Sequence, residues 1–288
     1  MVATTHQEPL ILIDSHVHLY NCFDFDRFFD SAFNNFSSSV KNSSGLNPFS
    51  SVLLLTETSN DRYFQELSRS VKSPGENPNS PHPSPLKKWQ LRATGESCSL
   101  YAHRAGTEGL YLIAGRQIVT AENLEVLALA SAEDFEDGQP LETTLERTIA
   151  AGGIPVIPWG FGKWVGRRGK ILGDLLEENK FPVLFLGDNS GRPIFWPRPP
   201  LFQQAERQGM RVLPGTDPLP FPRESLRPGG FGFSMAGQLD PEQPARSLKQ
   251  LLLEEKTPIQ PYGSLENPWR FIRNQIAMQI VKRQRRKP

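Results

Sequence analysis

The sequence predicts a single α/β barrel of the TIM-like (β/α) type. Short apolar runs of strand length alternate with segments of helical period along most of the chain. One strand and one helix together take roughly 25–30 residues, the size of the βα units that build barrels. The chain has 288 residues, and such a barrel typically needs about 250 residues. One barrel with insertions therefore accounts for residues 1–288 as one domain.

The first part of the chain begins this alternation. The run LILID at 10–14 is short, apolar and partly β-branched, which favours a buried strand. Phenylalanines spaced three or four residues apart predict an amphipathic helix over 23–40. A second buried strand is expected at 51–56, and Asp61 is placed to cap a helix over 61–71.

The middle of the chain differs in character. Five prolines with Gly, Ser and Asn predict a disordered surface insertion at about 72–87. Short β-type runs split by Gly or polar turns then extend over 87–130, and the first of them are expected to form a meander of hairpins. A helix over 140–151 follows, and it ends before Gly152 and Gly153.

The second half returns to alternating strands and helices. Strands are expected at 154–158, 181–187 and 210–217, and helices at 171–178, 200–209, 245–256 and 266–284. The last of these belongs to a basic C-terminal helical segment at about 266–288. Trp269, Ile272, Ile276 and Ile280 fall on one side of it.

Composition excludes several classes of protein. Lys and Arg number 32 against 31 Asp and Glu, so the net charge of +1 gives no overall field that favours nucleic acid. Two cysteines without a CxxC spacing are too few for a disulfide framework. The N-terminus has neither a basic signal region nor an apolar run that could cross a membrane. We expect a cytoplasmic protein with reduced thiols, no membrane partner and a solvated basic tail; a nucleic-acid or phospholipid contact is the alternative for that tail.

The sequence Asp14-Ser15-His16-Val17-His18 carries the sharpest chemical signal. Residues i and i+2 of an extended chain project to the same side, so His16 and His18 can converge on one cation. They follow a strand's carboxyl end, where α/β proteins place their chemistry. The pattern predicts a metal site, and ordinary loop hydrogen bonds are the alternative.

A carboxylate is expected to join this pair. Asp217 follows the predicted strand MRVLP, and the first and last strands of a closed barrel are neighbours. Asp217 is therefore a candidate metal ligand and a catalytic residue that accepts a proton from a metal-bound water. A turn aspartate before Pro218 is the alternative.

The run GLYLIAGRQIVTAENLEVLALA at 109–130 resembles the PHP (polymerase and histidinol phosphatase) domain of the amidohydrolase-like group. The resemblance extends over roughly residues 10–240. It implies a distorted seven-stranded barrel that binds up to three metal ions, often to hydrolyse phosphoesters. His16 and His18 stand at the family's first motif, and Asp217 stands at the aspartate of its last motif.

The chain departs from the family's pattern at four ligand positions. Gln117 replaces the bridging glutamate, Glu125 replaces a histidine, and Trp159 and Leu219 replace two further histidines. Trp and Leu cannot ligate a metal, and an amide supplies no bridging anion. The pattern therefore predicts at most a one-metal site of His16, His18 and Asp217, with Glu125 or Glu57 as a further ligand.

The segment WGFGKWVGRRGK at 159–170 follows a predicted strand on the expected active face. Its glycines let backbone amides approach an anion, and arginine binds phosphate through paired donors. The predicted substrate-binding residues are Trp159, Lys163, Arg167, Arg168 and, at the end of the next strand, Asp188. A flexible basic lid without a ligand is the alternative.

These observations predict a divergent metal-dependent hydrolase that acts on a phosphoester with one divalent metal ion, Zn, Mn or Fe. Its partner would be a small anionic or phosphorylated ligand. The alternative is a metal-free pseudoenzyme that binds an anionic ligand or a protein through the segment 159–170. A nucleic-acid accessory role is a third, less favoured hypothesis, and the sequence gives no signal for an oligomer.

Overall fold

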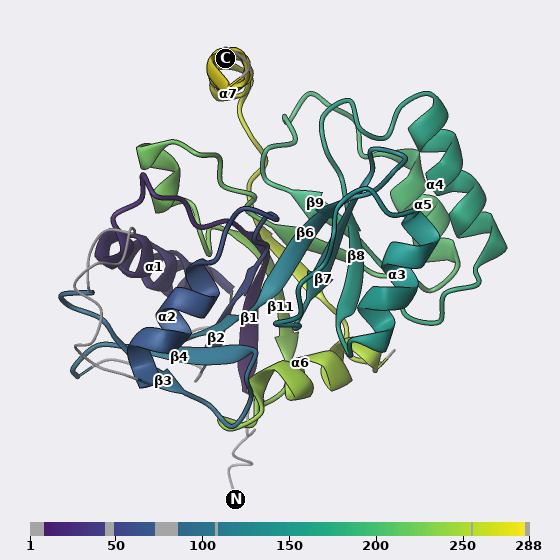
Figure 1. Cartoon of the computed structure of the whole chain (residues 1–288). Coiled ribbons are helices and arrows are strands. Elements are labelled where there is room, and N and C mark those ends of the chain that lie inside the picture. The colour runs from purple at the N-terminus through teal and green to yellow at the C-terminus, as the bar shows by residue number, and fades with distance from the viewer. Residues whose placement is uncertain (1–8, 44–48, 73–85, 107–108, 255, 286–288) are drawn as a thin grey trace, which may run out of the picture.

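The computed structural model describes residues 9–43, 49–72, 86–106, 109–254 and 256–285 (Figure 1). Nearly all of the predicted proline-rich insertion lies outside these residues. One sheet contains β1 (Leu10–Val17), β2 (Phe49–Leu55), β3 (Gln90–Ala93), β4 (Ser99–His103), β5 (Leu110–Ile113), β11 (Phe231–Ala236) and β12 (Gln260–Gly263). The other contains β6 (Gly115–Val119), β7 (Glu125–Leu129), β8 (Ile154–Pro158), β9 (Phe185–Asn189) and β10 (Val212–Gly215).

The prediction of a closed seven-stranded TIM-like barrel is wrong. The described strands form two open, mixed sheets, in the orders β12-β11-β1-β2-β5-β4-β3 and β10-β9-β8-β7-β6. The physical reason is the antiparallel strand β11, which is not among the strands predicted from the sequence. It pairs with β1 from Leu10 opposite Ala236 to Ile13 opposite Phe233, on the side of β1 that a closing strand would occupy.

Side-chain alternation builds three apolar layers around the two sheets. Ile11 and Ile13 of β1 face a core that both sheets share, whereas Leu12 faces the opposite side. On that opposite side α1 (Phe25–Ser43) and α2 (Tyr63–Lys72) cover the seven-stranded sheet. The helices α3 (Leu141–Ala150), α4 (Arg167–Glu178) and α5 (Pro200–Arg207) cover the outer face of the five-stranded sheet (Figure 1).

The shared core is closed at one end and carries polar groups at the other. The helix α6 (Pro244–Leu253) packs on the shared core near the start of β1. At the far end the two sheets meet through backbone hydrogen bonds, Asp217 N–H to His16 O (2.7 Å) and Gln117 N–H to Glu57 O (2.8 Å). The seam between the sheets therefore brings His16, Gln117 and Asp217 to one place.

Most predicted elements are confirmed, with shifted bounds. β1 continues to Val17, so His16 lies inside the strand. β9 covers Phe185–Asn189 instead of 181–187, and α4 begins at Arg167 instead of 171. The strands β3, β4 and β5 form the expected antiparallel meander.

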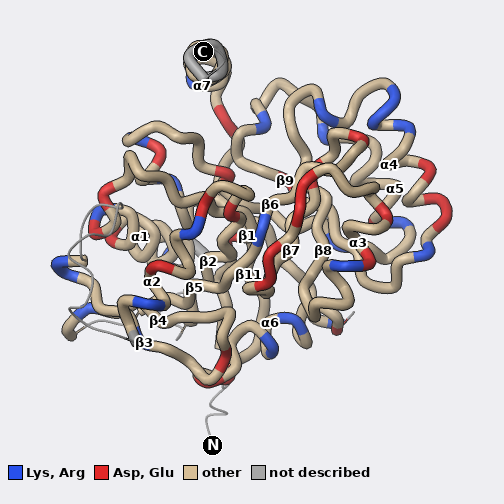
Figure 2. The backbone as a smooth tube through the Cα atoms, in the orientation of Figure 1, with Lys and Arg blue, Asp and Glu red and all other residues tan. Residues whose placement is uncertain are grey.

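The helix α7 (Pro268–Arg285) stands away from the body of the molecule (Figure 1). Phe271 anchors one side of it, while Trp269 on the other side is 83% exposed. Arg270 binds Glu224, which is fully buried in the 3-10 turn Pro222–Leu226, and Glu266. Residues of both charge signs are scattered along the described backbone (Figure 2). No described helix has the length and apolarity needed to cross a bilayer.

Candidate metal centre

His16 and His18 present their imidazoles on the same side of the end of β1. The Nε2 atoms of the two rings lie 3.2 Å apart, and both side chains are buried. Val17 between them faces the helix-covered core, because an irregularity in the pairing of β1 with β2 between Asp14 and Val17 reverses the alternation that Leu12 begins. The two-residue spacing therefore produces the convergence that the sequence predicts.

Asp217 reaches the histidines from the end of β10. Its backbone is left-handed (φ 47°), and its N–H donates to the carbonyl of His16. Its Oδ1 atom lies 3.6 Å from the Nε2 atom of His16 and 3.6 Å from that of His18. Gly215 allows this approach, because a Cβ atom there would lie 2.4 Å from the backbone nitrogen of His16.

The geometry of these three side chains fits one metal ion. Their ligand atoms form a triangle with sides of 3.2, 3.6 and 3.6 Å. The circle through its corners has a radius of about 2.0 Å, and zinc bonds to imidazole nitrogen and carboxylate oxygen are about 2.0–2.2 Å long. Among the described residues, this is the one group of three or more His, Cys, Asp or Glu side chains whose ligand atoms come so close together.

The environment of His18 favours the neutral form of its imidazole, which is the form that binds a metal. Burial, followed by the neighbouring His16, lowers the pKa of His18 to about 4, so its ring is neutral at pH 7. A neutral imidazole has the lone pair that metal binding requires. The hydroxyl oxygen of Thr56 lies 3.5 Å from Nε2 of His18, and the ring of Tyr20 stacks on His18 with centroids 5.7 Å apart.

A buried carboxylate, Asp14, fixes the backbone on which the site is built. It accepts hydrogen bonds from the N–H and hydroxyl of Thr216 (2.8 and 2.6 Å) and from the N–H of Gly229 (2.9 Å). It thus ties β1 to the residue before Asp217 and to the segment that leads into β11. Burial raises the pKa of Asp14 to about 7, although its hydrogen bonds oppose that shift. Asp14 is not among the residues that the sequence predicts for the site.

A chain of polar contacts extends the site toward the segment 159–170. The Nε2 atom of Gln117 donates to Glu125 (3.2 Å), so its Oε1 atom faces Nε2 of His16 at 3.1 Å. Glu125 also forms an ion pair with Lys163. Glu125, a predicted metal ligand, therefore lies outside the group of three and orients Gln117. Gln117 thus places a neutral oxygen beside His16, at a position where the sequence predicts no ligand.

Asn189 orients Asp217 from the end of β9. Its amide nitrogen donates to Oδ2 of Asp217 (3.1 Å) and to the backbone carbonyl of Trp159 (2.8 Å). The neighbouring Asp188, predicted to bind substrate, accepts two hydrogen bonds from Arg192 at 2.9 and 2.7 Å. The carboxylate of Asp188 is therefore occupied by a buried ion pair.

The remaining predicted site residues lie around this centre. Arg168 donates to the carbonyls of Asn123 and Gly162 and so braces its own loop. Arg167 is exposed at the first turn of α4. Trp159 is buried and lines a cavity.

Glu57, the other carboxylate considered as a ligand, lies apart from the group of three. It pairs with Arg116 (3.4 Å) and accepts a hydrogen bond from the N–H of Phe64 (2.6 Å). Burial raises the pKa of Glu57 to about 7 against the opposing effect of these two partners.

Comparison with known proteins gives one finding on the fold. The chain matches no protein-family model and no curated protein sequence. Its structure is similar to the crystal structure of PsfC from Pseudomonas syringae PB-5123, with a TM-score of 0.53. Sequence identity is 13%, and the match covers 95% of this chain and 99% of that chain. At this identity the likeness shows a shared fold alone.

Proposed function

We propose that this chain is a divergent metal-dependent hydrolase that binds one divalent cation and hydrolyses a phosphoester. The observation that carries the proposal is the triangle of His16, His18 and Asp217, which fits a single cation. Two imidazoles and a carboxylate suit zinc, manganese or iron. The three residues also stand where the sequence resembles the PHP motifs. We therefore further propose a distant relationship to that family in its ligand positions, but not in its closed barrel, since the described sheets of this chain are open.

The residues around the triangle would have different roles in such a site. When bound, the cation would act as a Lewis acid and activate water at neutral pH. The side chain of Asp217 is 29% exposed while both histidines are buried, so substrate would enter on the Asp217 side. Asn189 holds the carboxylate of Asp217 in place, and Gln117 offers a neutral oxygen beside His16.

Lys163 supplies a positive charge next to the centre. Its ammonium group is partly exposed and pairs with Glu125. A phosphoryl group that enters beside Asp217 would compete with Glu125 for the ammonium group of Lys163. Lys163, rather than Arg168, is therefore the residue that we assign to the anionic part of the substrate.

Calorimetric titration with Zn²⁺ and Mn²⁺ tests the metal site, and p-nitrophenyl phosphate tests the activity. We expect one ion per chain, and loss of both binding and hydrolysis in His16→Ala and Asp217→Ala. His103→Ala is the matched control, because His103 is a partly buried histidine on β4 that stacks on Tyr101 away from the group of three. No binding by the wild type, or equal binding by Asp217→Ala, would contradict the proposal.

A metal-free binding protein is the second candidate function. It is favoured by the cavity that Trp159 lines, because such a cavity can hold a ligand without any catalysis. Under this candidate, His16→Ala would leave ligand binding unchanged. We also propose a reducing, cytoplasmic setting, since Cys22 and Cys98 are both free thiols.

A further inference from the structure

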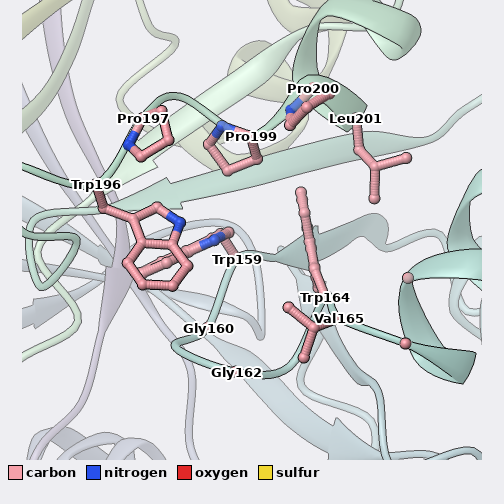
Figure 3. A pocket seen from close by; sticks show the side chains of 12 residues that line it. Trp159, Gly160, Gly162, Trp164, Val165, Trp196, Pro197, Pro199, Pro200 and Leu201 are labelled. Atoms are coloured by element: carbon pink, nitrogen blue, oxygen red, sulfur yellow. The ribbon is translucent and has the colours of Figure 1, made fainter.

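A cavity of about 440 Å³ lies at the carboxyl end of β8 (Figure 3). It is formed by the segment that follows β8, the first turn of α4 and the segment that leads into α5. Its walls include Trp159, Trp164, Trp196, Pro197, Pro199 and Leu201. A volume of this size falls in the range of small-molecule pockets, about 300–1,000 Å³.

The chemistry of the walls is aromatic and uncharged. Figure 3 shows the rings of Trp159 and Trp196 on one side and the ring of Trp164, seen edge-on, across from them. None of the described residues that line the cavity carries a charge. Lys163, Arg167 and Arg168 belong to the same segment, yet they do not line the cavity. The cavity is therefore suited to a planar apolar group and not to an anion.

The cavity and the metal centre share structural elements. The backbone carbonyl of Trp159 accepts the hydrogen bond from Asn189, and the same amide group donates to Asp217. Gly160, also in the cavity wall, packs on the side-chain carbons of Lys163, because a Cβ atom there would lie 2.8 Å from Cδ of Lys163. Trp159 in the cavity wall is thus linked through Asn189 to the carboxylate of Asp217. Gly160 in the same wall contacts the side chain of Lys163.

We propose that this cavity binds a planar aromatic group of the substrate, so that the preferred phosphoester is an aryl ester and not an alkyl ester. The ring would stack against Trp196 and Trp159, while the phosphoryl group lies toward Asp217 and Lys163. The stacking part depends on the cavity alone. The ester preference rests on the proposed hydrolase function.

The binding test uses 1-naphthyl phosphate as the probe and quenching of tryptophan fluorescence as the readout, with the protein kept in EDTA. Trp196→Ala is the informative variant, because Trp196 is half-buried at the edge of the core and not inside it. Its Kd should rise about 5- to 150-fold, the range for losing one stacking partner. Trp196→Phe should retain most of the affinity. Trp269→Phe, which removes an exposed indole far along the chain on α7, should bind like the wild type.

The outcomes separate this inference from the proposed function. If n-butyl phosphate competes as well as 1-naphthyl phosphate, or if Trp196→Ala and Trp269→Phe bind equally, the cavity does not recognise the ring. A metal-loaded enzyme that hydrolyses aryl and alkyl esters with equal kcat/KM would also overturn the inference and leave the hydrolase proposal intact. Ring binding that depends on Trp196, in a chain that binds no metal, would support the cavity and contradict the hydrolase.

Discussion

Replacing Asp14 with asparagine measures how strongly one buried carboxylate holds the site together. Oδ1 of Asp14 accepts the N–H groups of Thr216 (2.8 Å) and His16 (3.3 Å). Oδ2 accepts the hydroxyl of Thr216 (2.6 Å) and the N–H of Gly229 (2.9 Å). An asparagine must turn its NH₂ group toward one of these two sets of donors. The hydroxyl of Thr216 can rotate and accept, so the better orientation leaves one buried donor, the N–H of Gly229, without an acceptor.

One buried donor without an acceptor costs about 1–3 kcal/mol. We therefore expect Asp14→Asn to lower the free energy of unfolding by that amount, measured by urea denaturation at pH 4. At that pH the folded carboxyl, with its pKa of about 7, is protonated and uncharged like the asparagine, yet its oxygen still accepts the N–H of Gly229. Asp240→Asn is the control, because Asp240 also accepts a backbone N–H but is exposed. It should change stability by less than about 0.5 kcal/mol. Equal midpoints for Asp14→Asn and the wild type would refute this account of the clamp.

Four further changes test other parts of the structure. Gly215→Ala places a methyl group 2.4 Å from the backbone nitrogen of His16, and the overpacking should cost about 1–3 kcal/mol. A Cβ atom at Gly173 in α4 would lie 3.7 Å from its nearest neighbour, which is ordinary contact. Gly173→Ala should therefore stabilise the protein by up to about 1 kcal/mol, because alanine favours a helix more than glycine does. Thermal melts compare Gly215→Ala and Gly173→Ala with the wild type. Glu57 has a pKa near 7 in the fold, above its ordinary value of 4.5, so the folded state keeps a proton that the unfolded chain has released. The stabilisation that the protonated Glu57 contributes is full below pH 4.5 and is lost as pH rises to 7, by up to about 1.4 kcal/mol per pH unit. Glu57→Gln should remove this pH dependence from the free energy of unfolding measured in urea titrations. An unchanged pH dependence would contradict the shifted pKa. Glu224→Gln should cost about 1.5–3 kcal/mol, since it weakens buried bonds to Arg227 and Arg270, and a loss below 0.5 kcal/mol would show that α7 is held by Phe271 instead.

The ligands of the site could be predicted because their signals are local. A two-residue spacing at a strand end fixes the common direction of His16 and His18, and this needs no knowledge of the rest of the fold. Asp217 was predicted from its place at the end of a strand, although the expected reason, closure of a barrel, was wrong. A hydrogen bond between Asp217 and the backbone of His16 brings the two strand ends together in open sheets.

The sheet arrangement could not be predicted from the same signals. Periodicity shows which side chains of a strand are buried, but it does not name the strand's neighbour. β11 has the sequence FGFSMA, in which a glycine and small residues weaken the strand pattern, and it pairs with a partner more than 200 residues earlier in the chain. The apolar run at 181–187 likewise begins before β9, because Phe181 and Leu184 are buried against the helices although they precede the strand.

The supporting residues of the site were missed for a related reason. Gln117 looked like a lost ligand, and its orientation became clear from its hydrogen bond to Glu125. The cavity combines Trp159 and Trp164 with Trp196, which belongs to a different segment. The tryptophans gave a signal in the sequence, but their meeting depends on how α4 and α5 pack.

Anomalous diffraction tests the central claim most directly. Crystals grown with zinc chloride would be measured at energies just above and just below the zinc absorption edge. We predict one strong anomalous peak at about 2.0–2.2 Å from Nε2 of His16, Nε2 of His18 and Oδ1 of Asp217. An anomalous map with no peak between these three atoms, in crystals that bind zinc at surface residues, would contradict the claim that they form a metal site.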